Sequence, residues 1–431
     1  VFESGNFSGN PAIIRRNTRY EDGRYSFVGS PVQQNANTIG EGLGSFVFKY
    51  NESIPYGSND GLSRWEVASM DQLIPGTGYT QADQLEITFS GVPNVGEITV
   101  NGSYTEDTDD ANEGWNLVAN PYATAISVAD FLAENTHTNG AVYLWDDNGS
   151  DVQRGSNADY IVANTTMATA TAAGGQSRYN FHLGSAQGFF IKLNDAMSTD
   201  IVFTEAMRVE DSNSDENFFR TTHLPLVRLN LTNHDGLFRQ TVIGFAEDAL
   251  IDQLNPKYDA SAFHRNAEDG IFTLKAGRSL ALNGASSDWE VIQLQLNVAK
   301  SGQYAFDIES ENFQGTLYLK DNYTGEIIDM TSESYPFSAQ PGIHTNRFEL
   351  LSKTAPLLGW QNRDVQVFAH DHILYLRHPE GEKRVYQLYD LHGRQLLTKE
   401  VDQDAELDLR HLRNGIYLVY DGAKTHKILL K

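Results

Sequence analysis

The feature of this chain that most restricts its fold is an internal repeat of short, aromatic-rich segments. Four segments recur in the same order, at offsets of 90, 95, 110 and 114 residues: 25–31 with 115–121, 46–50 with 141–145, 75–79 with 185–189, and 85–89 with 199–203. Offsets that only increase indicate one unit present twice, with insertions in the second copy. Short segments, turn glycines and a proline after the first strand predict that each copy is a β unit.

The second copy should contain one short helix at 127–134. Ser127 stands at the N-cap position, and Asp130 follows three residues later, as in a capping box. Beyond the repeat, residues 218–351 hold short segments in which apolar and polar residues alternate. This pattern predicts strands with one face in a core and the other in water, and therefore a β-sandwich.

The 431 residues exceed what one hydrophobic core usually serves. Polar stretches near 212 and 353 predict boundaries. The expected fold is all-β, with tandem β-sandwich domains and a last, small immunoglobulin-like sandwich of about seven strands. The expected domains are a first repeat unit at 1–109, a second with the helix at 110–211, a β-sandwich at 212–353, a linker at 354–363, and a C-terminal domain at 364–431.

The charge of the chain excludes one large class of partner. The formal net charge is −25, and a chain this acidic repels phosphate backbones, so nucleic acid is not expected as a partner. Of 32 Lys and Arg and 57 Asp and Glu, residues 364–431 hold 10 and 11, which leaves 22 against 46 upstream. The C-terminal segment is therefore a compositionally distinct part.

The absence of cysteine excludes disulfides, zinc–thiolate sites and thiol nucleophiles, and it suits long exposure outside the cell. No apolar run approaches the roughly 18 residues of a membrane-spanning helix. Val1 opens a polar stretch without a leader pattern. We therefore expect a chain that is processed or begins partway through a longer one, so the first unit is expected to be incomplete at its N-terminal side.

The C-terminal 68 residues are predicted to be consecutive hairpins. Tyr389-Asp-Leu-His-Gly-Arg394 is a turn in which Gly393 can adopt a positive φ. Leu409-Arg-His-Leu-Arg-Asn-Gly-Ile-Tyr417 leads into another strand, and His426-Lys-Ile-Leu-Leu-Lys431 ends the chain. In this order and spacing, the three segments resemble the type A C-terminal sorting domain of the type IX secretion system of Bacteroidota, also known as the Por secretion tail family.

The resemblance implies export and surface location. In that family the domain directs passage through the outer-membrane translocon, and a surface sortase then removes it and usually joins the cargo to lipopolysaccharide. The expected partners are therefore the translocon, its shuttle or sortase components, and lipopolysaccharide. The residues that match the sorting motif by position are Gly393, Arg394, Gly415, Tyr417, Lys427 and Lys431.

Motifs that would indicate catalysis are absent from the sequence: it has no H-E-x-x-H, G-x-S-x-G or P-loop. His370 and His372 would lie on one face of a strand and could hold a metal, but ordinary polar histidines are the favoured interpretation. Calcium is the best cofactor candidate, because hard oxygen ligands alternate in one loop. These ligands are Asp211, Asn213, Asp215 and Glu216, with weaker versions at 146–151 and 107–110.

The function of residues 1–353 is the least readable part. The leading hypothesis is a non-enzymatic, adhesin-like or structural surface module. One alternative is carbohydrate binding on exposed tryptophans, although most aromatics should be core; the tryptophans considered are Trp65, Trp115, Trp145 and Trp289. Another is that the chain is the accessory C-terminal region of a larger secreted hydrolase, with the catalytic domain upstream of Val1. A third is a substrate held on the translocon with its tail uncleaved.

Overall fold

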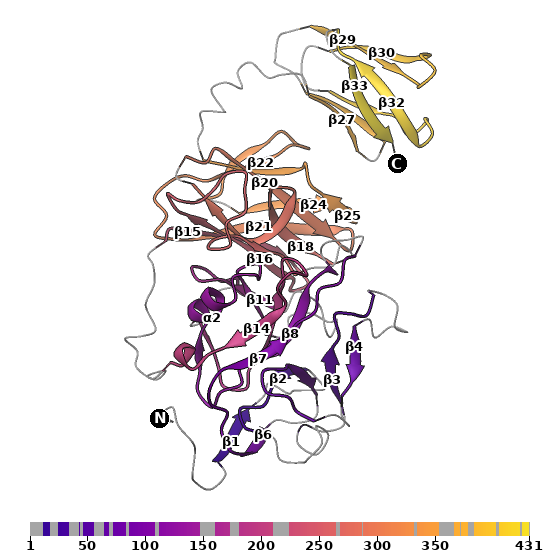
Figure 1. Ribbon diagram of the computed structural model, residues 1–431. Coiled ribbons are helices and arrows are strands. Elements are labelled where there is room, and N and C mark those ends of the chain that lie inside the picture. Colours follow the sequence, from indigo (N-terminus) through magenta and orange to yellow (C-terminus); the bar gives the residue numbers. More distant parts are fainter. Residues whose placement is uncertain are drawn as a thin grey trace. The chain divides into compact units, whose positions relative to one another are not determined.

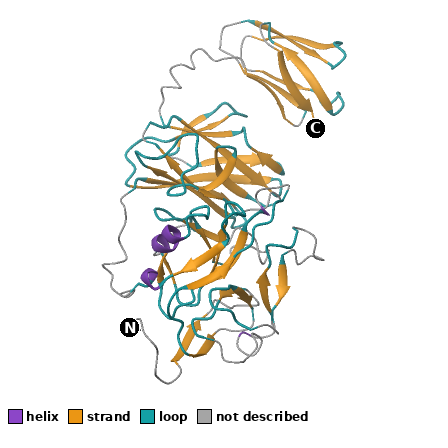
Figure 2. Ribbon diagram, in the orientation of Figure 1, coloured by secondary structure: helices purple, strands orange, loops and turns teal. Residues whose placement is uncertain are grey.

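The computed structural model is almost entirely β, which confirms the expected fold class (Figure 2). It describes residues 12–17, 25–33, 43, 46–55, 64–68, 72–82, 86–107, 112–146, 160–172, 181–209, 224–263, 268–286, 288–331, 334–352, 366–370, 372–377, 383–401, 405–422 and 425–430. The chain divides into two compact parts. The main part is Val1–Leu319 with Ile328–Leu350, and the other is Leu351–Lys431 with Lys320–Ile327.

The first repeat unit consists of one strand pair and one four-stranded sheet (Figure 1). The pair is β1 (Ala12–Asn17) with β6 (Glu86–Gly91), and it is antiparallel. The sheet order is β2-β5-β3-β4, formed by β2 (Ser26–Val28), β5 (Tyr79–Gln81), β3 (Val47–Tyr50) and β4 (Trp65–Val67).

The second unit has the same strand order as the first. Its pair is β7 (Ile98–Asn101) with β14 (Asp200–Phe203), and its sheet order is β8-β13-β10-β11. The sheet strands are β8 (Trp115–Ala119), β13 (Gly188–Lys192), β10 (Val142–Trp145) and β11 (Tyr160–Ala163). The strand β7 precedes the expected boundary at residue 110, yet it pairs within the second unit.

The second unit also contains shorter elements. They are β9 (Ile126–Ser127), β12 (His182–Leu183), the 3-10 helix η3 (Glu205–Met207) and α2 (Val128–Glu134). The predicted helix is thereby confirmed, and so is its cap, because the Ser127 hydroxyl oxygen accepts a 3.2 Å hydrogen bond from the backbone N–H of Asp130.

The strand registers show that the repeat in the sequence is a repeat in space. Phe27 opposes Thr80 in the first unit, and the equivalent residues Leu117 and Phe190 oppose each other in the second. The other strands of the two sheets pair in the same equivalent registers: Tyr50 with Trp65 and Trp145 with Tyr160, and Phe48 with Thr80 and Tyr143 with Phe190. The offsets found in the sequence are therefore structural equivalences.

Contacts between the two units are reciprocal. The backbone N–H of Gly29 donates to the Ala186 carbonyl at 2.9 Å, and the equivalent N–H of Ala119 donates to the Gly76 carbonyl at 2.8 Å. Two isolated bridges repeat this exchange, Val28 with Gln187 and Thr77 with Val118. When a contact between two residues is repeated, with the roles exchanged, by their equivalents in the other unit, the interface has two-fold symmetry. The two units thus pack like the subunits of a fused dimer.

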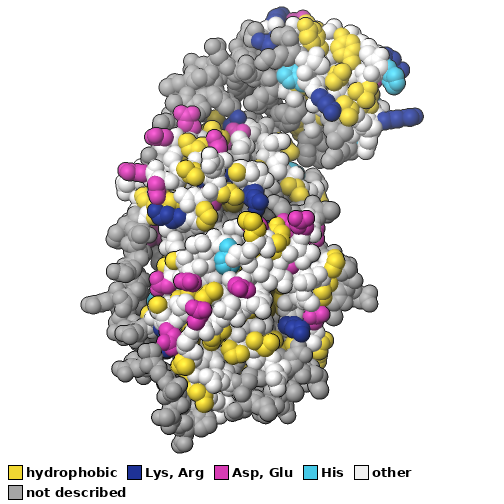
Figure 3. Space-filling model, in the orientation of Figure 1, with side chains coloured by type: hydrophobic (Ala, Val, Ile, Leu, Met, Phe, Trp, Pro, Cys, Tyr) yellow, Lys and Arg dark blue, Asp and Glu magenta, His cyan; other side chains and the backbone are white. Residues whose placement is uncertain are grey.

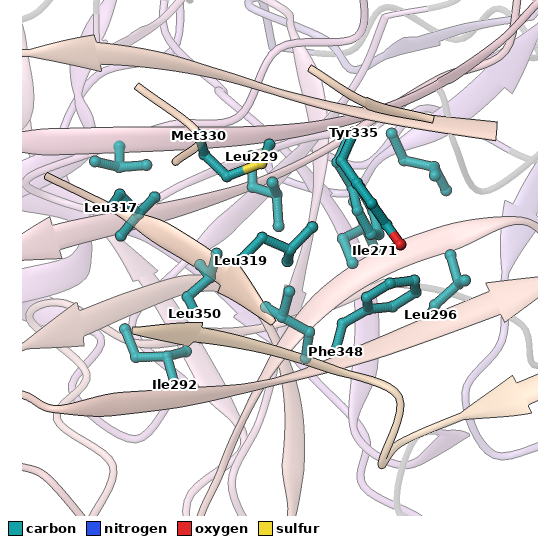
Figure 4. Close-up of a cluster of buried hydrophobic side chains, with 14 of the residues drawn as sticks. Leu229, Ile271, Ile292, Leu296, Leu317, Leu319, Met330, Tyr335, Phe348 and Leu350 are labelled. Carbon is teal, nitrogen blue, oxygen red and sulfur yellow. The ribbon is translucent and has the colours of Figure 1, made fainter. Parts of the chain in front are cut away.

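The third region, here called the sandwich, is one long sheet that encloses its own core. Its strand order is β23-β22-β26-β20-β18-β19-β16-β15-β21-β24, with β17 added to β19 and β25 to β20. The core draws apolar side chains from strands far apart in that order, including Leu229, Leu296, Leu319 and Phe348 (Figure 4). The strands are β15 (Leu226–Asn233), β16 (Phe238–Phe245), β17 (Ala260–Ser261), β18 (Gly270–Lys275), β19 (Arg278–Ala285), β20 (Val291–Val298), β21 (Gly302–Glu311), β22 (Tyr318–Asp321), β23 (Ile327–Asp329), β24 (Tyr335–Ala339), β25 (Gly342–His344) and β26 (Phe348–Leu351).

The expectation that each sandwich strand has one face in water is wrong for β15. Six of its eight residues are buried, including the polar Arg228 and Asn230. The reason is that the second unit packs on the face that was expected to be solvated. Arg228 Nη1 donates a 2.8 Å hydrogen bond to the Ala168 carbonyl, and the N–H of Ala170 donates to Gln240 Oε1 at 2.8 Å. Polar side chains on this face therefore join two layers.

The tail, residues 364–431, has the expected seven strands among its described residues, in two sheets. One sheet has the order β27-β28-β31 and the other β30-β29-β32-β33. A separate cluster of buried side chains, such as Leu376, Leu388 and Val419, fills the space between them. The strands are β27 (Gln366–His370), β28 (Ile373–Arg377), β29 (Arg384–Tyr389), β30 (Gln395–Val401), β31 (Ala405–Asp408), β32 (Gly415–Tyr420) and β33 (Thr425–Leu430).

Candidate functional site

The strand registers of the tail bring three residues of the predicted sorting motif, Gly393, Arg394 and Gly415, to one end of its four-stranded sheet. The turn with Gly393 and Arg394 joins β29 to β30 directly beyond the Tyr389–Gln395 pair. Gly415 begins β32 at the same end, because Tyr389 pairs with Leu418 further along. Gly415 also opposes Leu430, so the last described residue of β33 reaches this end too. Segments more than 20 residues apart in sequence thus form one edge of the domain.

The Asp390 carboxylate builds the turn at this end. It accepts hydrogen bonds from the backbone N–H of His392 at 2.9 Å, from that of Arg394 at 3.0 Å, and from Arg394 Nε at 3.1 Å. The pKa of Asp390 is lowered, chiefly by the backbone N–H of Arg394, because each of these donors favours the charged carboxylate. Gly393 has φ of 78°, which confirms the positive φ predicted for it.

The remaining motif residues differ in their surroundings. Tyr417 is packed in the tail core, and its hydroxyl donates a 2.8 Å hydrogen bond to the Arg413 carbonyl. Lys427 is exposed on β33 opposite Leu418. Lys431 lies outside the described residues. The structure therefore gives Tyr417 a packing role, while Arg394 and Lys427 present their charges to solvent.

His372 belongs to the same end of the tail. It has φ of 60° in the β27–β28 turn, and its Nε2 lies 3.1 Å from Asn414 Oδ1, so it joins the two sheets beside Gly415. The side chain of His370 is outside the described residues. The structure places no group of three His, Cys, Asp or Glu side chains that could hold a metal ion, within the part of the chain that it describes.

The calcium hypothesis stays a prediction. Its main ligands, Asp211, Asn213, Asp215 and Glu216, lie outside the described residues. In the weaker candidates, Asp146 Oδ2 accepts a 2.8 Å hydrogen bond from Thr171, and the backbone N–H of Asp107 donates to Glu113. In the view of Figure 3, Asp and Glu side chains are scattered over the main part and do not gather in one patch.

The tryptophans proposed as a sugar platform are mostly core. Trp115 and Trp289 are 3% and 8% exposed, while Trp65 and Trp145 are half-buried. Trp65 meets the ring of Phe190 edge to face, with an interplanar angle of 78°. Rings packed edge to face do not form the flat, coplanar surface on which a sugar would stack. Trp65, Trp115 and Trp145 instead belong to a continuous cluster where the first unit, the second unit and the sandwich meet, and Trp289 belongs to the core of the sandwich.

The main part has a polar cavity of about 230 Å³ between the second unit and the sandwich. Its walls come from the ends of β8 and β13, from the β18–β19 hairpin, and from the segment around β17. The lining residues are Tyr104, Glu113, Asn139, Lys192, Leu193, Asn194, Leu254, Pro256, Asp259, Ser261, Arg278 and Leu280. Sequence reasoning missed this site, because its walls are contributed by segments about 170 residues apart.

The charges around this cavity are unusual for so acidic a chain. Asp259 is neutralised by Lys275 Nζ at 2.8 Å, and both side chains are buried. The lining also holds Glu113 and two cations, Lys192 and Arg278, so with Lys275 counted the cations at the cavity outnumber the carboxylates. Such a cavity can bind a small ligand that carries a carboxylate as well as hydroxyl groups.

Two residues of the lining, Tyr104 and Glu113, are hydrogen-bonded to each other. The Tyr104 hydroxyl donates a 2.7 Å hydrogen bond to Glu113 Oε2. The pKa of Tyr104 is raised to about 12, first by this hydrogen bond and then by burial and by the nearby carboxylates. The hydroxyl therefore stays a neutral donor at any physiological pH.

Comparisons with known proteins give a family but no activity. A family model described as "Domain of unknown function (DUF8693)" matches residues 3–351, which end before the tail. No curated protein matches the chain. A solved structure titled "Biofilm associated protein - BSP domain" aligns with 98% of this chain and 92% of its own, at 11% identity and a TM-score of 0.17. Among the described residues, no helix is long and apolar enough to cross a membrane.

Proposed function

The chain belongs to the DUF8693 family, and from its geometry we propose that it is a non-catalytic, adhesin-like module displayed on the cell surface, with the tail as its export signal. The observation that carries the proposal is that Gly393, Arg394 and Gly415, three of the six predicted motif residues, lie at one end of a separately packed tail. They come together there although Gly415 is more than 20 residues from the other two in the sequence. A translocon component can bind such an edge as one surface.

The organisation of the chain supports the same proposal. The tail has its own core and forms a compact part distinct from the main part. An export signal must be recognised whatever cargo precedes it, so it should fold on its own core. The proposed partners are the type IX translocon, its shuttle or sortase components, and lipopolysaccharide after cleavage of the tail.

The test compares two exposed positions on the same tail sheet. Arg394 lies at the motif end with a side chain that is 77% exposed, and Val385 lies at the other end and is 43% exposed. The variants Arg394→Ser and Val385→Ser, and a chain that lacks 414–431, are expressed in a bacterium with a type IX system. Surface protein is then measured by protease accessibility and mass spectrometry of its C-terminus.

We expect the truncated chain to stay inside, Arg394→Ser to reach the surface several-fold less, and Val385→Ser to match the parent. The export part of the proposal fails if the truncated chain reaches the surface with the same C-terminus as the parent. Equal loss in both point variants would mean that stability of the tail, and not its motif end, decides export.

The cavity supports a second candidate function, the binding of an acidic saccharide. This replaces the tryptophan platform with a site whose hydrogen-bonding groups and two cations suit hydroxyls and a carboxylate. Calorimetry with trigalacturonate and neutral galactotriose tests it. We expect at least tenfold tighter binding of the charged sugar, and loss of that preference in Arg278→Ala, which changes an exposed side chain. Equal binding of both sugars would reject the candidate.

A further inference from the structure

The two repeat units present equivalent sheet faces, and only one of them is covered by the sandwich. The second-unit face consists of Trp115, Ala141, Tyr143, Tyr160 and Val162. By the offsets and registers given above, the first-unit face consists of the equivalent residues Tyr25, Phe46, Phe48, Trp65 and Val67. Both faces carry aromatic and aliphatic side chains, so covering either face would remove apolar surface from water.

The sandwich covers the second-unit face. Trp115, Ala141, Tyr143, Tyr160 and Val162 are 3%, 0%, 0%, 9% and 4% exposed. The contact is centred on one ring of the sandwich, Phe263, which lies 4.3 Å from Trp115 and 4.5 Å from Tyr160 between ring centroids. The described rings around Phe263 all belong to the second unit.

The first-unit face is more exposed than its equivalent. Tyr25, Phe46 and Val67 are 38%, 61% and 61% exposed, while Phe48 and Trp65 are half-buried. The ring pair that holds Phe263 in the second unit is nevertheless preserved. Trp115 and Tyr143 meet at 4.7 Å and 78°, and their equivalents Tyr25 and Phe48 meet at 6.5 Å and 68°. An edge-to-face ring pair is therefore present in both units, and its two rings lie further apart in the first unit.

We propose that the first-unit face is a docking site for a partner protein, which places on it an extended segment with an aromatic side chain flanked by small residues. The second unit supplies the template for this partner. Its face is covered by Tyr258-Asp-Ala-Ser-Ala-Phe263, in which two alanines flank a serine and precede the inserted ring. The face is also continuous with an existing interface, because Phe27 and Trp65 belong to the same aromatic cluster as Trp145 and Phe190.

The geometry favours an aromatic side chain over a sugar. Tyr25 and Phe48 meet edge to face, and such a pair accepts a third ring as Trp115 and Tyr143 accept Phe263, whereas a pyranose stacks on an open ring plane. The net charge of −25 opposes association of two copies of the chain. A partner of neutral or basic surface therefore fits best. This inference does not depend on the function proposed for the tail.

The probe is a fluorescent peptide with the sequence of residues 255–264, which carries the Phe263 template. Its binding to the full chain is measured by fluorescence polarisation, and the chain is followed by sedimentation velocity. The chain variants are Val67→Asp and Phe46→Ser, with Ile251→Asp as the matched control, because Val67 and Ile251 are 61% and 64% exposed. Circular dichroism melts check that each variant folds.

We expect saturable binding in the submillimolar range, weakened at least tenfold by Phe→Ala at the position of residue 263 in the peptide. Val67→Asp and Phe46→Ser should each weaken it at least tenfold, and Ile251→Asp by less than twofold. The proposal is overturned by no binding at millimolar peptide or by equal binding to Val67→Asp. It is also overturned if an oligosaccharide such as galactotriose binds this face instead, or if sedimentation shows a dimer that Val67→Asp dissociates.

Discussion

The first and second units are two copies of one β unit in different surroundings. Both have a strand pair, a four-stranded sheet of the same order, and an aromatic face. The sandwich buries that face in the second unit, where Trp115 is 3% exposed, and leaves its equivalent in the first unit, Tyr25, 38% exposed. The comparison teaches that the aromatic-rich strand pattern produces an apolar sheet face in both units. Whether that face is buried depends on a different region of the chain, the sandwich.

The largest expected difference concerns Trp115 and Tyr25 themselves. Trp115→Ala removes a buried ring that contacts Tyr143 and Phe263, so it should cost about 3–5 kcal/mol of unfolding free energy. Tyr25→Ala changes a partly exposed ring and should cost less than about 1 kcal/mol. Urea denaturation followed by circular dichroism measures both. Equal costs would show that the first-unit face is as covered as the second.

The next effect concerns the ion pair that ties the first unit to the second. Glu52 and Arg64 lie 3.5 Å apart with side chains 1% exposed, and Glu52 also accepts hydrogen bonds from the N–H groups of Thr105 and Gly114. Glu52→Gln leaves the Arg64 charge buried and should cost about 3 kcal/mol. The control is Glu86→Gln, because Glu86 forms an exposed pair with Arg15 and should contribute less than about 1 kcal/mol.

Smaller effects should follow at the reciprocal glycines between the units. A Cβ on Gly188 would lie 2.8 Å from the Phe27 backbone carbonyl carbon, and a Cβ on its equivalent Gly78 would lie 2.6 Å from Leu117 Cγ. Each Gly→Ala change should therefore cost about 1–3 kcal/mol by overpacking. Gly302→Ala, where the nearest atom is 3.6 Å away, is the neutral control. A cost at one position only would argue against the two-fold relation.

The smallest effect is a pH dependence confined to the second-unit side of the cavity. The folded pKa of Tyr104 is raised to about 12 from the ordinary 10.0, so the folded state holds this proton more tightly than the unfolded state. The resulting stability is complete below about pH 10 and is lost as the pH rises through about 12. Ultraviolet difference titration should show this late ionisation step, and Tyr104→Phe should remove it.

Much of the fold could be predicted because it depends on local pattern. Ser127 caps the helix α2 as expected, since an N-cap and its helix are neighbours in sequence. Turn chemistry likewise placed Gly393 at a positive φ. The solvated face of β15 was predicted wrongly, because alternation cannot show that Arg228 and Asn230 meet a second layer. The polar cavity was missed for the same reason, since Glu113 and Arg278 lie together only after the second unit docks on the sandwich.

The sequence by itself determined that one β unit occurs twice and which segments of the two copies correspond. These properties depend on alternation and turn residues within a copy, and both copies retain them. Only the tertiary structure decided that Phe263 covers Trp115 while Tyr25 stays exposed. The physical reason is that hydrophobic burial is not directional, so the pattern within one copy creates an apolar face without specifying which surface covers it.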